Sequence, residues 1–280
     1  MAEIIDGKKI AKQLNKKTLK EIERLGGNIP GLAIILVGQR EDSKLYVGLK
    51  EKEARKIGIE THVYKCEQDI EEEKILEMIE HLNSDDEIDA ILIQLPLPKN
   101  FDTDKIIKAI DPKKDVDRFH PENTKVLQST CSHEHVMPPV LGVVLEMLEQ
   151  IDFDTDQKVG CVIANSEIFG ESLAKVLQCK GMNVEFCGPD DTNLIKKTSR
   201  ADVLISAVGR PSFVVKDMVK QDAVVIDVGI TKEGKEVLGD VDFDDVKERA
   251  SHITPVPGGV GPATVSMLLL NTVRLAAKNK

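Results

Sequence analysis

Residues 32–57 contain the apolar run Leu-Ala-Ile-Ile-Leu-Val, the polar turn Gly-Gln-Arg-Glu-Asp and the mixed segment Ser-Lys-Leu-Tyr-Val-Gly-Leu-Lys-Glu-Lys-Glu-Ala-Arg-Lys-Ile. The unbroken apolar run predicts a strand over Leu32–Val37 that is buried on both faces, as strands of parallel sheets are. The apolar spacing of the last segment predicts a helix over Ser43–Ile57, with Ser43 as its N-cap. A buried strand followed by a helix is the repeating unit of an α/β fold with a parallel sheet.

The same alternation recurs along most of the chain, which predicts the α/β class with right-handed crossovers. Further strands are predicted at Ala90–Leu95, Lys158–Ala164, Val203–Val208 and Ala223–Val228, with weaker ones at Thr61–Lys65 and Asn183–Cys187. Further helices are predicted at Lys9–Leu25, Glu71–Leu82, Val140–Gln150, Gly170–Lys180, Asp242–Arg249 and Ala263–Lys278.

The alternation stops between Asp111 and Pro139, where prolines and charges are frequent and apolar periodicity is weak. A long loop of this kind is usually functional or connects domains. The 280 residues also suit about two domains. We therefore expect one domain over 1–138 and a second over 139–262, with a cleft between them and the last helix, 263–280, packing back on the first. Ligands are expected at the carboxyl ends of the strands.

The composition excludes several partner classes. A net charge of −10 makes nucleic acid and anionic lipid unexpected partners. No stretch resembles a signal peptide or a run of about 18 apolar residues that would span a membrane. The cysteines are five in number and scattered, which predicts reduced thiols and a cytoplasmic location.

Tyr46 and Lys50 lie on the helix that follows the first buried strand. They are four residues apart, so they share one helix face near the carboxyl end of that strand. The ring could stack on a flat heterocycle, and the amine could transfer protons if burial lowers its pKa. The pattern by itself is common, and on its own it more often marks a surface lysine beside a half-buried tyrosine.

Gln94 stands near the end of another apolar strand and is followed by Pro96 and Pro98. A buried amide needs hydrogen-bond partners, and the prolines end the strand. Gln94 could therefore contact a ligand or a neighbouring lysine, although a strand-end glutamine that reaches solvent is an equal alternative.

Asp115 and Asp117 flank one apolar residue in the irregular stretch. In an extended segment both would point to the same side, whereas in an irregular loop one could pair with local basic residues. A carboxylate can accept two N–H bonds from the edge of an aminopyrimidine. The local pattern alone also fits a solvated run of charges.

Three glycines lie within the four residues 258–261, between prolines and directly before the last helix. Such a loop lets the backbone approach another group closely, and the helix N-terminus could face an anion.

In their types, order and spacing, these segments resemble the bifunctional methylenetetrahydrofolate dehydrogenase/methenyltetrahydrofolate cyclohydrolase family, over essentially the whole chain. The most specific stretches are Ile93–Pro98, Lys114–Asp117, Ala207–Pro211, Val225–Ile230 and Thr254–Pro262. The resemblance implies a catalytic folate-binding domain followed by a Rossmann-like NAD(P)-binding domain, and a homodimer. It also implies oxidation of methylenetetrahydrofolate to methenyltetrahydrofolate, followed by hydrolysis to formyltetrahydrofolate, in one-carbon metabolism.

The resemblance also implies roles for individual residues. Lys50 would be the central catalytic residue, Tyr46 would stack on the folate, Gln94 would position Lys50, and Asp117 would hold the pterin. Further substrate contacts would come from Leu95, Pro96, Gly258, Gly259 and Pro262. Cofactor contacts would come from Ala164, Asn165, Ser166, Ile168, Gly170, Asp190, Gly209, Ile230 and Thr264.

The chain departs from the family mainly around the cofactor. Asn165 stands where the family has an arginine, and Asp190 and Asp191 follow a strand after which the family usually has Cys-His-Ser. An acidic residue about 20 positions after the glycine-rich turn binds the ribose of NAD and repels a 2′-phosphate, so Asp190 favours NAD over NADP. Two alternatives stay open: a degenerate cofactor site that leaves only the cyclohydrolase, and an N-cap role for these aspartates.

Other departures lie in the irregular stretch. Arg118 and Lys125 replace usual glycines, so we expect this loop to run differently. The segment 131–135, Cys-Ser-His-Glu-His, is too cramped for a metal site, and we predict no metal. Two other functions remain as alternatives: a different two-domain dehydrogenase for a hydroxy or amino acid, and a catalytically silent folate-binding protein.

Overall fold

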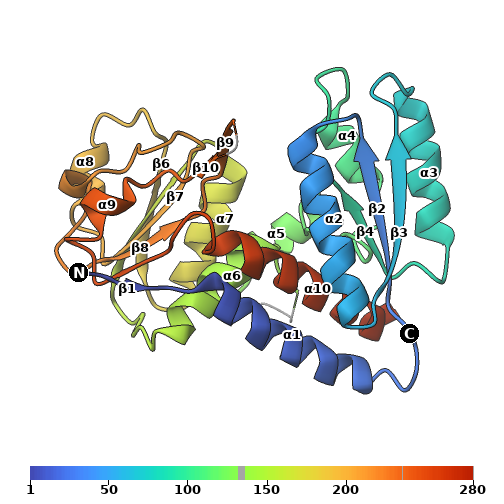
Figure 1. The fold of residues 1–280 in the computed structure, drawn as a ribbon, viewed down its shortest axis with the longest axis horizontal. Helices are drawn as coiled ribbons and strands as arrows, with labels where there is room; N and C mark the ends of the chain where they lie inside the picture. The colour runs from blue at the N-terminus through green and yellow to red at the C-terminus, as the bar shows by residue number, and fades with distance from the viewer. Residues whose placement is uncertain (132–135, 235, 280) are drawn as a thin grey trace. The chain divides into compact units, whose positions relative to one another are not determined.

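The computed structural model describes residues 1–131, 136–234 and 236–279. The chain folds into two compact units, each built around a parallel sheet (Figure 1). The three-stranded unit consists of Lys12–Val126, His133–Pro139 and Val265–Lys280. The six-stranded unit consists of Met1–Ala11, Leu127–Ser132 and Val140–Thr264. The α/β class predicted from the sequence is confirmed.

The sheet of the three-stranded unit has the order β3-β2-β4, and both pairings are parallel. The central strand β2 (Gly31–Val37) is buried at every residue. It is flanked by β3 (Glu60–Cys66) and β4 (Ala90–Ile93). Neither face of β2 meets solvent, which explains why Leu32–Val37 is apolar at every position.

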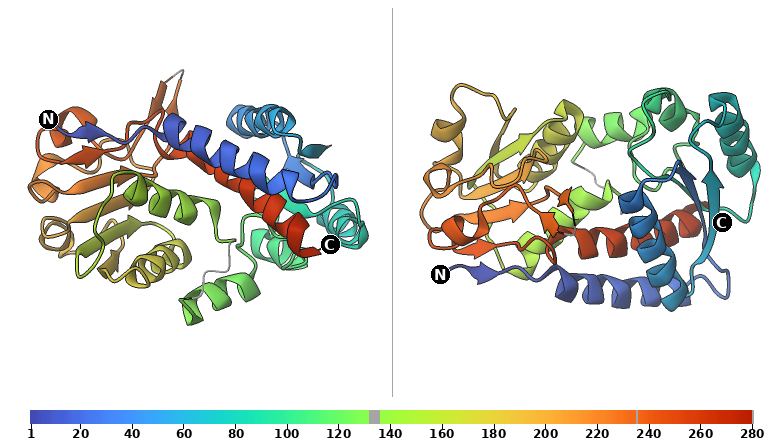
Figure 2. Two further views of the ribbon diagram at one scale, coloured as in Figure 1. Left: turned by 90° about the horizontal axis from the view of Figure 1, so that it is seen from below. Right: turned by 45° about the horizontal axis from the view of Figure 1, so that its top comes forward.

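Helices cover both faces of this sheet (Figures 1 and 2). On one face, the alternate residues Leu32, Ile34 and Leu36 join a core with side chains of α2 (Glu41–Lys56) and of α10 (Val260–Asn279). On the other face, Ala33, Ile35 and Val37 pack with α3 (Glu72–Ser84) and α4 (Thr103–Ala109). The period-two alternation of a strand thus divides one apolar run between two cores.

The stretch from Asp111 to Pro139, for which the sequence predicted no regular structure, contains a helix. This helix, α5 (Pro121–Ser129), begins at a proline, which fits a first helical position because no backbone N–H is required there. The sequence also missed α4, whose N-cap Asp102 accepts a hydrogen bond from the Lys105 N–H over 3.0 Å. Both helices are short, at seven and nine residues, so neither is long enough to show a clear apolar periodicity.

The sheet of the six-stranded unit has the order β1-β11-β8-β7-β5-β6 and is parallel throughout. The strands are β1 (Glu3–Ile4), β5 (Val159–Ala164), β6 (Asn183–Cys187), β7 (Val203–Ala207), β8 (Val224–Asp227) and β11 (His252–Ile253). The chain passes from β5 to β6 on one side and then returns to place β7 on the other side of β5. Such a reversal creates a crevice at the carboxyl end of β5, where open α/β sheets bind ligands.

Helix α7 (Glu167–Gln178) packs on β5 and β6 of this sheet. The unit also contains α6 (Pro139–Gln150), α8 (Leu194–Thr198), α9 (Phe243–Val246), the 3₁₀ turn Lys216–Met218, the hairpin of β9 (Thr231–Glu233) and β10 (Glu236–Leu238), and the start of α1 (Gly7–Glu23). Several predicted helix boundaries were wrong, two of them in α7 and α9. The helix α7 starts three residues before Gly170 because Ser166 caps it, and the helix expected over Asp242–Arg249 is confined to α9.

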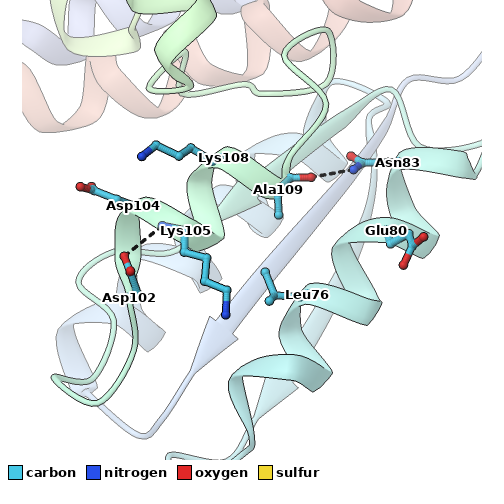
Figure 3. A pocket seen from close by; sticks show the side chains of 8 residues that line it. All are labelled: Leu76, Glu80, Asn83, Asp102, Asp104, Lys105, Lys108 and Ala109. Carbon is cyan, nitrogen blue, oxygen red and sulfur yellow. Dashed lines mark hydrogen bonds between the residues drawn. The ribbon is translucent and has the colours of Figure 1, made fainter.

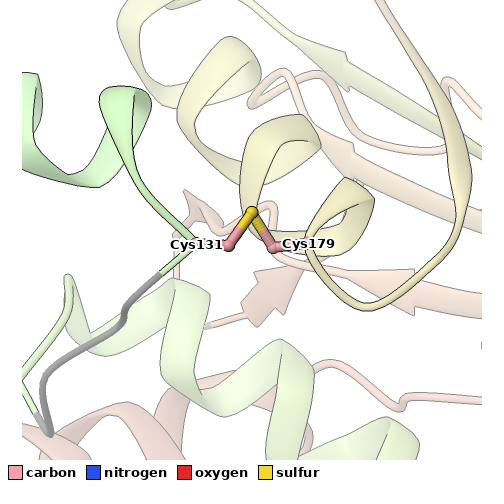
Figure 4. The surroundings of a disulfide bond; sticks show 2 residues. All are labelled: Cys131 and Cys179. Atoms are coloured by element: carbon pink, nitrogen blue, oxygen red, sulfur yellow. A yellow bond between two sulfur atoms is a disulfide. The ribbon is translucent and has the colours of Figure 1, made fainter.

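A disulfide bond joins Cys131 to Cys179, the C-cap residue of α7 (Figure 4). Their Cα atoms are 5.3 Å apart, within the usual range for a disulfide. The prediction that all five thiols are reduced is therefore wrong for this pair, because the fold brings together two cysteines that are 48 residues apart. Cys66, Cys161 and Cys187 are free and buried.

The expectation that no stretch could span a membrane also needs correction. Within α10, Val260–Lys278 is long and apolar enough to cross a membrane by length and composition. However, 72% of its apolar window is buried inside the protein, and the core helix of a soluble protein passes the same test.

Gly31 provides a test of the packing at the start of β2. A Cβ atom there would lie 2.0 Å from the backbone oxygen of Glu87, which cannot move away without shifting the chain. We expect Gly31→Ala to lower the free energy of unfolding by about 2–4 kcal/mol, measured by urea denaturation. The matched control is Gly48→Ala in α2, where nothing lies within 4 Å of the added atom. It should raise stability by about 0.5–1 kcal/mol, and equal effects of the two changes would contradict the packing argument.

Candidate active site and cofactor site

Lys50 and Gln94 form a direct contact in the three-stranded unit. Lys50 Nζ donates a hydrogen bond to Gln94 Oε1 over 2.8 Å. The Gln94 amide nitrogen donates in turn to the Leu95 carbonyl over 2.7 Å. Both the oxygen and the nitrogen of the Gln94 amide therefore have a hydrogen-bond partner within the protein. The side chain needs these partners because it is only 9% exposed to water. The sequence left open whether Gln94 contacts a ligand, a neighbouring lysine or solvent, and the structure shows the contact with the lysine.

The start of α2 brings Tyr46 and Lys50 to this place. The helix begins at Glu41, so the prediction that Ser43 is the N-cap is wrong. Ser43 is buried in the first turn, and its N–H donates to the Asp42 carboxylate, which also pairs with Arg40 over 2.6 Å. The two-residue shift arises because the polar turn contributes its last two residues to the helix.

Burial sets the electrostatics around Lys50. Burial lowers the pKa of the Lys50 amine, and the nearby Asp117 carboxylate opposes that shift. Burial raises the pKa of Asp117 to about 6, against the influence of Lys50 and with a smaller contribution from Asp115. Burial also raises the pKa of the Tyr46 hydroxyl, and the nearby Asp42 carboxylate raises it further. A lysine with a lowered pKa is a better base at neutral pH than an exposed one.

The two aspartates of the irregular stretch have different environments. The Asp115 carboxylate is buried and accepts hydrogen bonds from the backbone N–H groups of Arg118 and His120, over 2.9 and 2.8 Å, and from the Asn123 amide over 3.0 Å. Asp115 thus holds the loop together, and its partners are mainly backbone groups. The option in which both aspartates are available to a ligand is therefore wrong for Asp115, and Asp117 is the candidate that remains.

Arg118 keeps a glycine-like backbone conformation, with φ of 61°. Its N–H is held by Asp115, and its Nη1 donates to the Pro112 carbonyl over 2.7 Å. These contacts explain how a residue with a side chain occupies a backbone conformation that favours glycine. Lys125 is exposed on α5, where a helical conformation has no need of glycine. Leu95 is half-buried and Pro96 is exposed after β4.

The glycine-rich loop before α10 belongs to the six-stranded unit. Gly258 has φ of 112°, and its carbonyl accepts a hydrogen bond from the Gly7 N–H over 3.0 Å. A Cβ atom on Gly7 would lie 1.7 Å from the Gly259 oxygen. The close approach that the sequence predicted is therefore made, at least in part, to the N-terminus of α1. Pro262 lies in the first turn of α10, which starts at Val260 rather than at the predicted Ala263.

The turn between β5 and α7 has the features of a dinucleotide-binding turn. Ser166 caps α7 by accepting from the Phe169 N–H. A Cβ atom on Gly170 would lie 2.2 Å from the Phe186 ring, so glycine permits the close packing of helix on strand. The Asn165 amide donates to the Val208 carbonyl. The Ala164 side chain is buried, which leaves only its backbone for a ligand.

The remaining predicted cofactor residues lie in the same unit. Gly209 has φ of 63°, which suits glycine in a tight turn after β7. Ile168 and Ile230 are exposed apolar side chains, and the Thr264 hydroxyl donates to the Val260 carbonyl over 2.9 Å. A helix N-terminus with amide donors and exposed apolar side chains fits the pyrophosphate and rings of a dinucleotide.

Two buried carboxylates that the sequence analysis did not identify support these loops. Asp240 accepts from the Ser206 hydroxyl and the Val208 N–H, over 2.9 and 2.7 Å, and from the Arg210 N–H over 2.9 Å. Asp227 accepts from the backbone N–H groups of Gly229, Asp240 and Val241, and burial raises its pKa to about 7. The sequence did contain a signal for Asp227, because a carboxylate at the end of an apolar strand needs hydrogen-bond donors.

Asp190 and Asp191 have separate roles after β6. Asp191 accepts from the Asn193 N–H over 2.7 Å and pairs with Lys197 over 2.7 Å just before α8. The N-cap residue of α8 is Asn193 itself, so the N-cap alternative is wrong, although Asp191 does stabilise the turn. Asp190 instead pairs with Arg210 over 3.1 Å, and its side chain is 83% exposed.

A groove lies between α3 and α4 with a volume of about 710 Å³ (Figure 3). The residues that line it are Leu76, Glu80, Asn83, Asp102, Asp104, Lys105, Lys108 and Ala109. It contains none of the predicted site residues. Within the described residues no cluster of at least three potential metal ligands is present. The metal candidate segment lies largely outside the described residues, and its Cys131 is in the disulfide.

Two family models together match most of the chain. The catalytic domain of tetrahydrofolate dehydrogenase/cyclohydrolase matches residues 5–117, and the NAD(P)-binding domain of the same enzymes matches residues 139–280. The chain belongs to the tetrahydrofolate dehydrogenase/cyclohydrolase family. The resemblance found in the sequence is therefore confirmed, as are the two kinds of domain.

Relatives of known name agree over their full lengths. The bifunctional protein FolD of Nitratiruptor sp. is 42% identical over 282 residues, which covers 99% of each chain. The bifunctional FolD structure from Campylobacter jejuni has a TM-score of 0.95 at 36% identity and covers 100% of each chain. The Trypanosoma brucei FolD structure, described as complexed with NADP cofactor and inhibitor, has a TM-score of 0.93 at 32% identity and covers 99% and 98%.

Membership of the tetrahydrofolate dehydrogenase/cyclohydrolase family decides between the alternatives. A hydroxy-acid or amino-acid dehydrogenase of similar architecture is excluded as the family of this chain. The substrates of the family are tetrahydrofolate derivatives, and its second domain binds NAD(P). The half-buried Lys50 amine is hydrogen-bonded to Gln94, an arrangement that a catalytically silent folate-binding protein does not need.

The raised pKa of Asp117 predicts a pH dependence of stability. A folded-state pKa of about 6, against an ordinary 3.8, means that ionising Asp117 opposes folding. This part of the stability is present below about pH 4 and is lost as the pH rises through about 6. We expect Asp117→Asn to be more stable than the parent by about 2 kcal/mol at pH 7, with the difference vanishing near pH 4. Urea unfolding from pH 4 to 8 measures it, and a constant difference across this range would contradict the assignment.

Proposed function

We propose that this chain oxidises methylenetetrahydrofolate to methenyltetrahydrofolate with a nicotinamide cofactor and hydrolyses the product to formyltetrahydrofolate, with Lys50 as the central catalytic residue. The observation that carries the proposal is the Lys50–Gln94 hydrogen bond of 2.8 Å, with an amine whose pKa is lowered by burial. Family membership supplies the reaction class, and this contact supplies the proton-handling group.

In this proposal each residue has a separate task. Tyr46 stacks on the folate from the same helix face as Lys50. Asp117 accepts N–H bonds from the aminopyrimidine edge of the pterin, and Gln94 fixes the direction of the Lys50 amine. Leu95, Pro96, Gly258, Gly259 and Pro262 are proposed as further substrate contacts.

A nicotinamide cofactor, which the turns around Ser166, Gly170 and Gly209 would hold, would supply the hydride acceptor for the methylene carbon of the substrate. Loss of that hydride would leave this carbon as a methenyl cation. A water molecule then adds to this carbon, and the neutral Lys50 amine takes the proton that the water loses. Return of a proton to the departing ring nitrogen opens the ring and gives the formyl product. The carbon is already cationic, so the chain needs to position the water and move protons rather than polarise a carbonyl.

Substitution of Lys50 tests the catalytic assignment. We expect Lys50→Met to lower the turnover number of the cyclohydrolase step at least about 10²-fold, because the amine that manages protons is gone. Folate binding should stay within about threefold of the parent, because the methionine chain fills similar space. Stopped-flow hydrolysis of methenyltetrahydrofolate and equilibrium titration of a folate ligand give the two quantities.

The control for this test is Lys52→Met, an exposed lysine on the same helix. It should change neither quantity. Full turnover in Lys50→Met would reject the assignment, and loss of folate binding in the same variant would show a positioning role instead.

We propose that NAD is preferred over NADP. The support is the exposed Asp190 carboxylate after β6, where an acidic residue binds the ribose hydroxyls and repels a 2′-phosphate. Asn165 also places a neutral amide where the resemblance expects an arginine, and that amide is used by the Val208 carbonyl.

The cofactor preference is tested by dehydrogenase turnover with methylenetetrahydrofolate and each cofactor in one preparation. We expect kcat/KM for NAD to exceed that for NADP by about tenfold, because a phosphate beside a carboxylate is repelled. A higher value for NADP would show that other groups hold the phosphate. Loss of turnover with both, while methenyltetrahydrofolate is still hydrolysed, would show a degenerate cofactor site.

Several wider features are also proposed. We place the catalytic folate-binding domain at 1–138, the Rossmann-like domain at 139–262, and the last helix, 263–280, with the first domain. Within the first range, Met1–Ala11 packs with the six-stranded sheet. We propose a homodimer in the cytoplasm without nucleic-acid or membrane partners, for which the net charge of −10 and the three buried free thiols are the support. The Cys131–Cys179 disulfide is the feature that such a location does not explain.

A further inference from the structure

An ion pair joins two loops at the carboxyl edge of the six-stranded sheet. Arg210 Nη1 lies 3.1 Å from Asp190 Oδ1, and the side chains are 47% and 83% exposed. Asp190 follows β6 and Arg210 follows β7, and these strands flank β5 on opposite sides. The ion pair therefore links the loops on either side of β5, at the carboxyl edge where the turn from β5 into α7 begins.

Arg210 stands on a rigid base. Its N–H donates to the buried Asp240 carboxylate over 2.9 Å, and the same carboxylate holds the Val208 N–H. Its guanidinium carbon lies 5.7 Å from the centre of the Phe213 ring, close enough for a cation–π contact. The start of the Arg210 side chain is thus fixed, whereas its guanidinium is open to solvent and to a ligand.

The loop that carries Asp190 is anchored by its neighbour. Asp191 is engaged by the Asn193 N–H and by Lys197. This leaves Asp190 as the carboxylate that points to Arg210, with one oxygen bound by the guanidinium. The second oxygen is available to accept a hydrogen bond from a ribose hydroxyl.

We propose that Arg210 is a second specificity-determining residue for the dinucleotide. Paired with Asp190, it orients that carboxylate toward the ribose hydroxyls; released from Asp190, its guanidinium binds a 2′-phosphate. The proposal rests on the proposed role of Asp190 in cofactor selection. It adds that the chain already holds a phosphate ligand, which the aspartate keeps occupied.

The chemistry of the two groups supports this double role. A guanidinium offers five N–H donors in a planar fork that matches phosphate geometry, and the contact with Asp190 uses one of them. With Asp190 present, the pair carries no net charge, and a phosphate must both displace the carboxylate and remain beside it. With a neutral residue at position 190, the same guanidinium becomes an unopposed cation at the ribose position.

Binding of adenosine fragments to the intact protein tests this without any catalytic step. The probes are adenosine 5′-monophosphate, which lacks the 2′-phosphate, and adenosine 2′,5′-bisphosphate, which carries it. Isothermal titration is made on the parent, Asp190→Asn, Arg210→Gln and the double variant. The control is Lys247→Gln, which removes a cation of the same sheet unit that also pairs with an aspartate, Asp244, and lies 5.7 Å from a ring.

We expect Asp190→Asn to bind the bisphosphate at least about tenfold more tightly than the parent does, because one charge-assisted contact is gained. The double variant should lose that gain. Arg210→Gln should bind the monophosphate about threefold more weakly, because the carboxylate is no longer oriented, and should not gain bisphosphate affinity. Lys247→Gln should match the parent with both probes.

Equal bisphosphate affinity in Asp190→Asn and the double variant would overturn the role of Arg210. Absence of any gain in Asp190→Asn would also overturn it. If the parent itself prefers the bisphosphate, the proposed preference for NAD fails. Even then, weaker bisphosphate binding in Arg210→Gln would support Arg210 as the phosphate ligand, and unchanged binding would reject it.

Discussion

A carboxylate that is taken out of water must be given hydrogen-bond donors, and the loops at both sheets depend on this constraint. Asp240 and Asp227 collect backbone N–H groups from the segments after β7 and β8. Asp115 does the same for the turn that contains Asp117. Because most of the donors to these carboxylates are backbone N–H groups, the carboxylates fix the path of the chain.

The same constraint gives a different result at Lys50 and Asp117, the residues proposed for the folate site. Lys50 and Asp117 are partly buried without such a full set of backbone partners, and burial lowers the pKa of Lys50 and raises that of Asp117. Lys50 keeps one neutral acceptor, Gln94, which directs the amine without adding a negative charge. A glutamate at that position would favour the protonated amine, which cannot act as a base. The neutral amide is therefore suited to the proton exchange proposed for Lys50.

The sequence predicted the longer strands because buried parallel strands are apolar at every position, as Leu32–Val37 is. It missed the strands of two or three residues, β1, β9, β10 and β11, which are too short to show a pattern. It also predicted that Gln94 needs a partner, and a nearby lysine was one of the two partners considered. It could not separate Asp115 from Asp117, because their difference lies in backbone donors that only the folded turn supplies. The disulfide and the Asp240 contacts join residues 30 or more positions apart, and no local pattern encodes such pairings.

The side chains proposed for cofactor choice and for catalysis differ in the physical cost of changing them. Asp190 and Arg210 are on loops whose paths are fixed by other residues, and their side chains are largely in solvent. Exchanging them changes the charge presented to a ligand but disturbs little packing, since surface substitutions usually change stability by about 0.5 kcal/mol or less. Gln94 is 9% exposed and hydrogen-bonded at both ends of its amide, so a change there leaves buried polar groups unpaired. The exposed charges proposed to set cofactor choice can therefore change at little cost in stability, whereas the Lys50–Gln94 pair depends on a part-buried hydrogen bond and cannot.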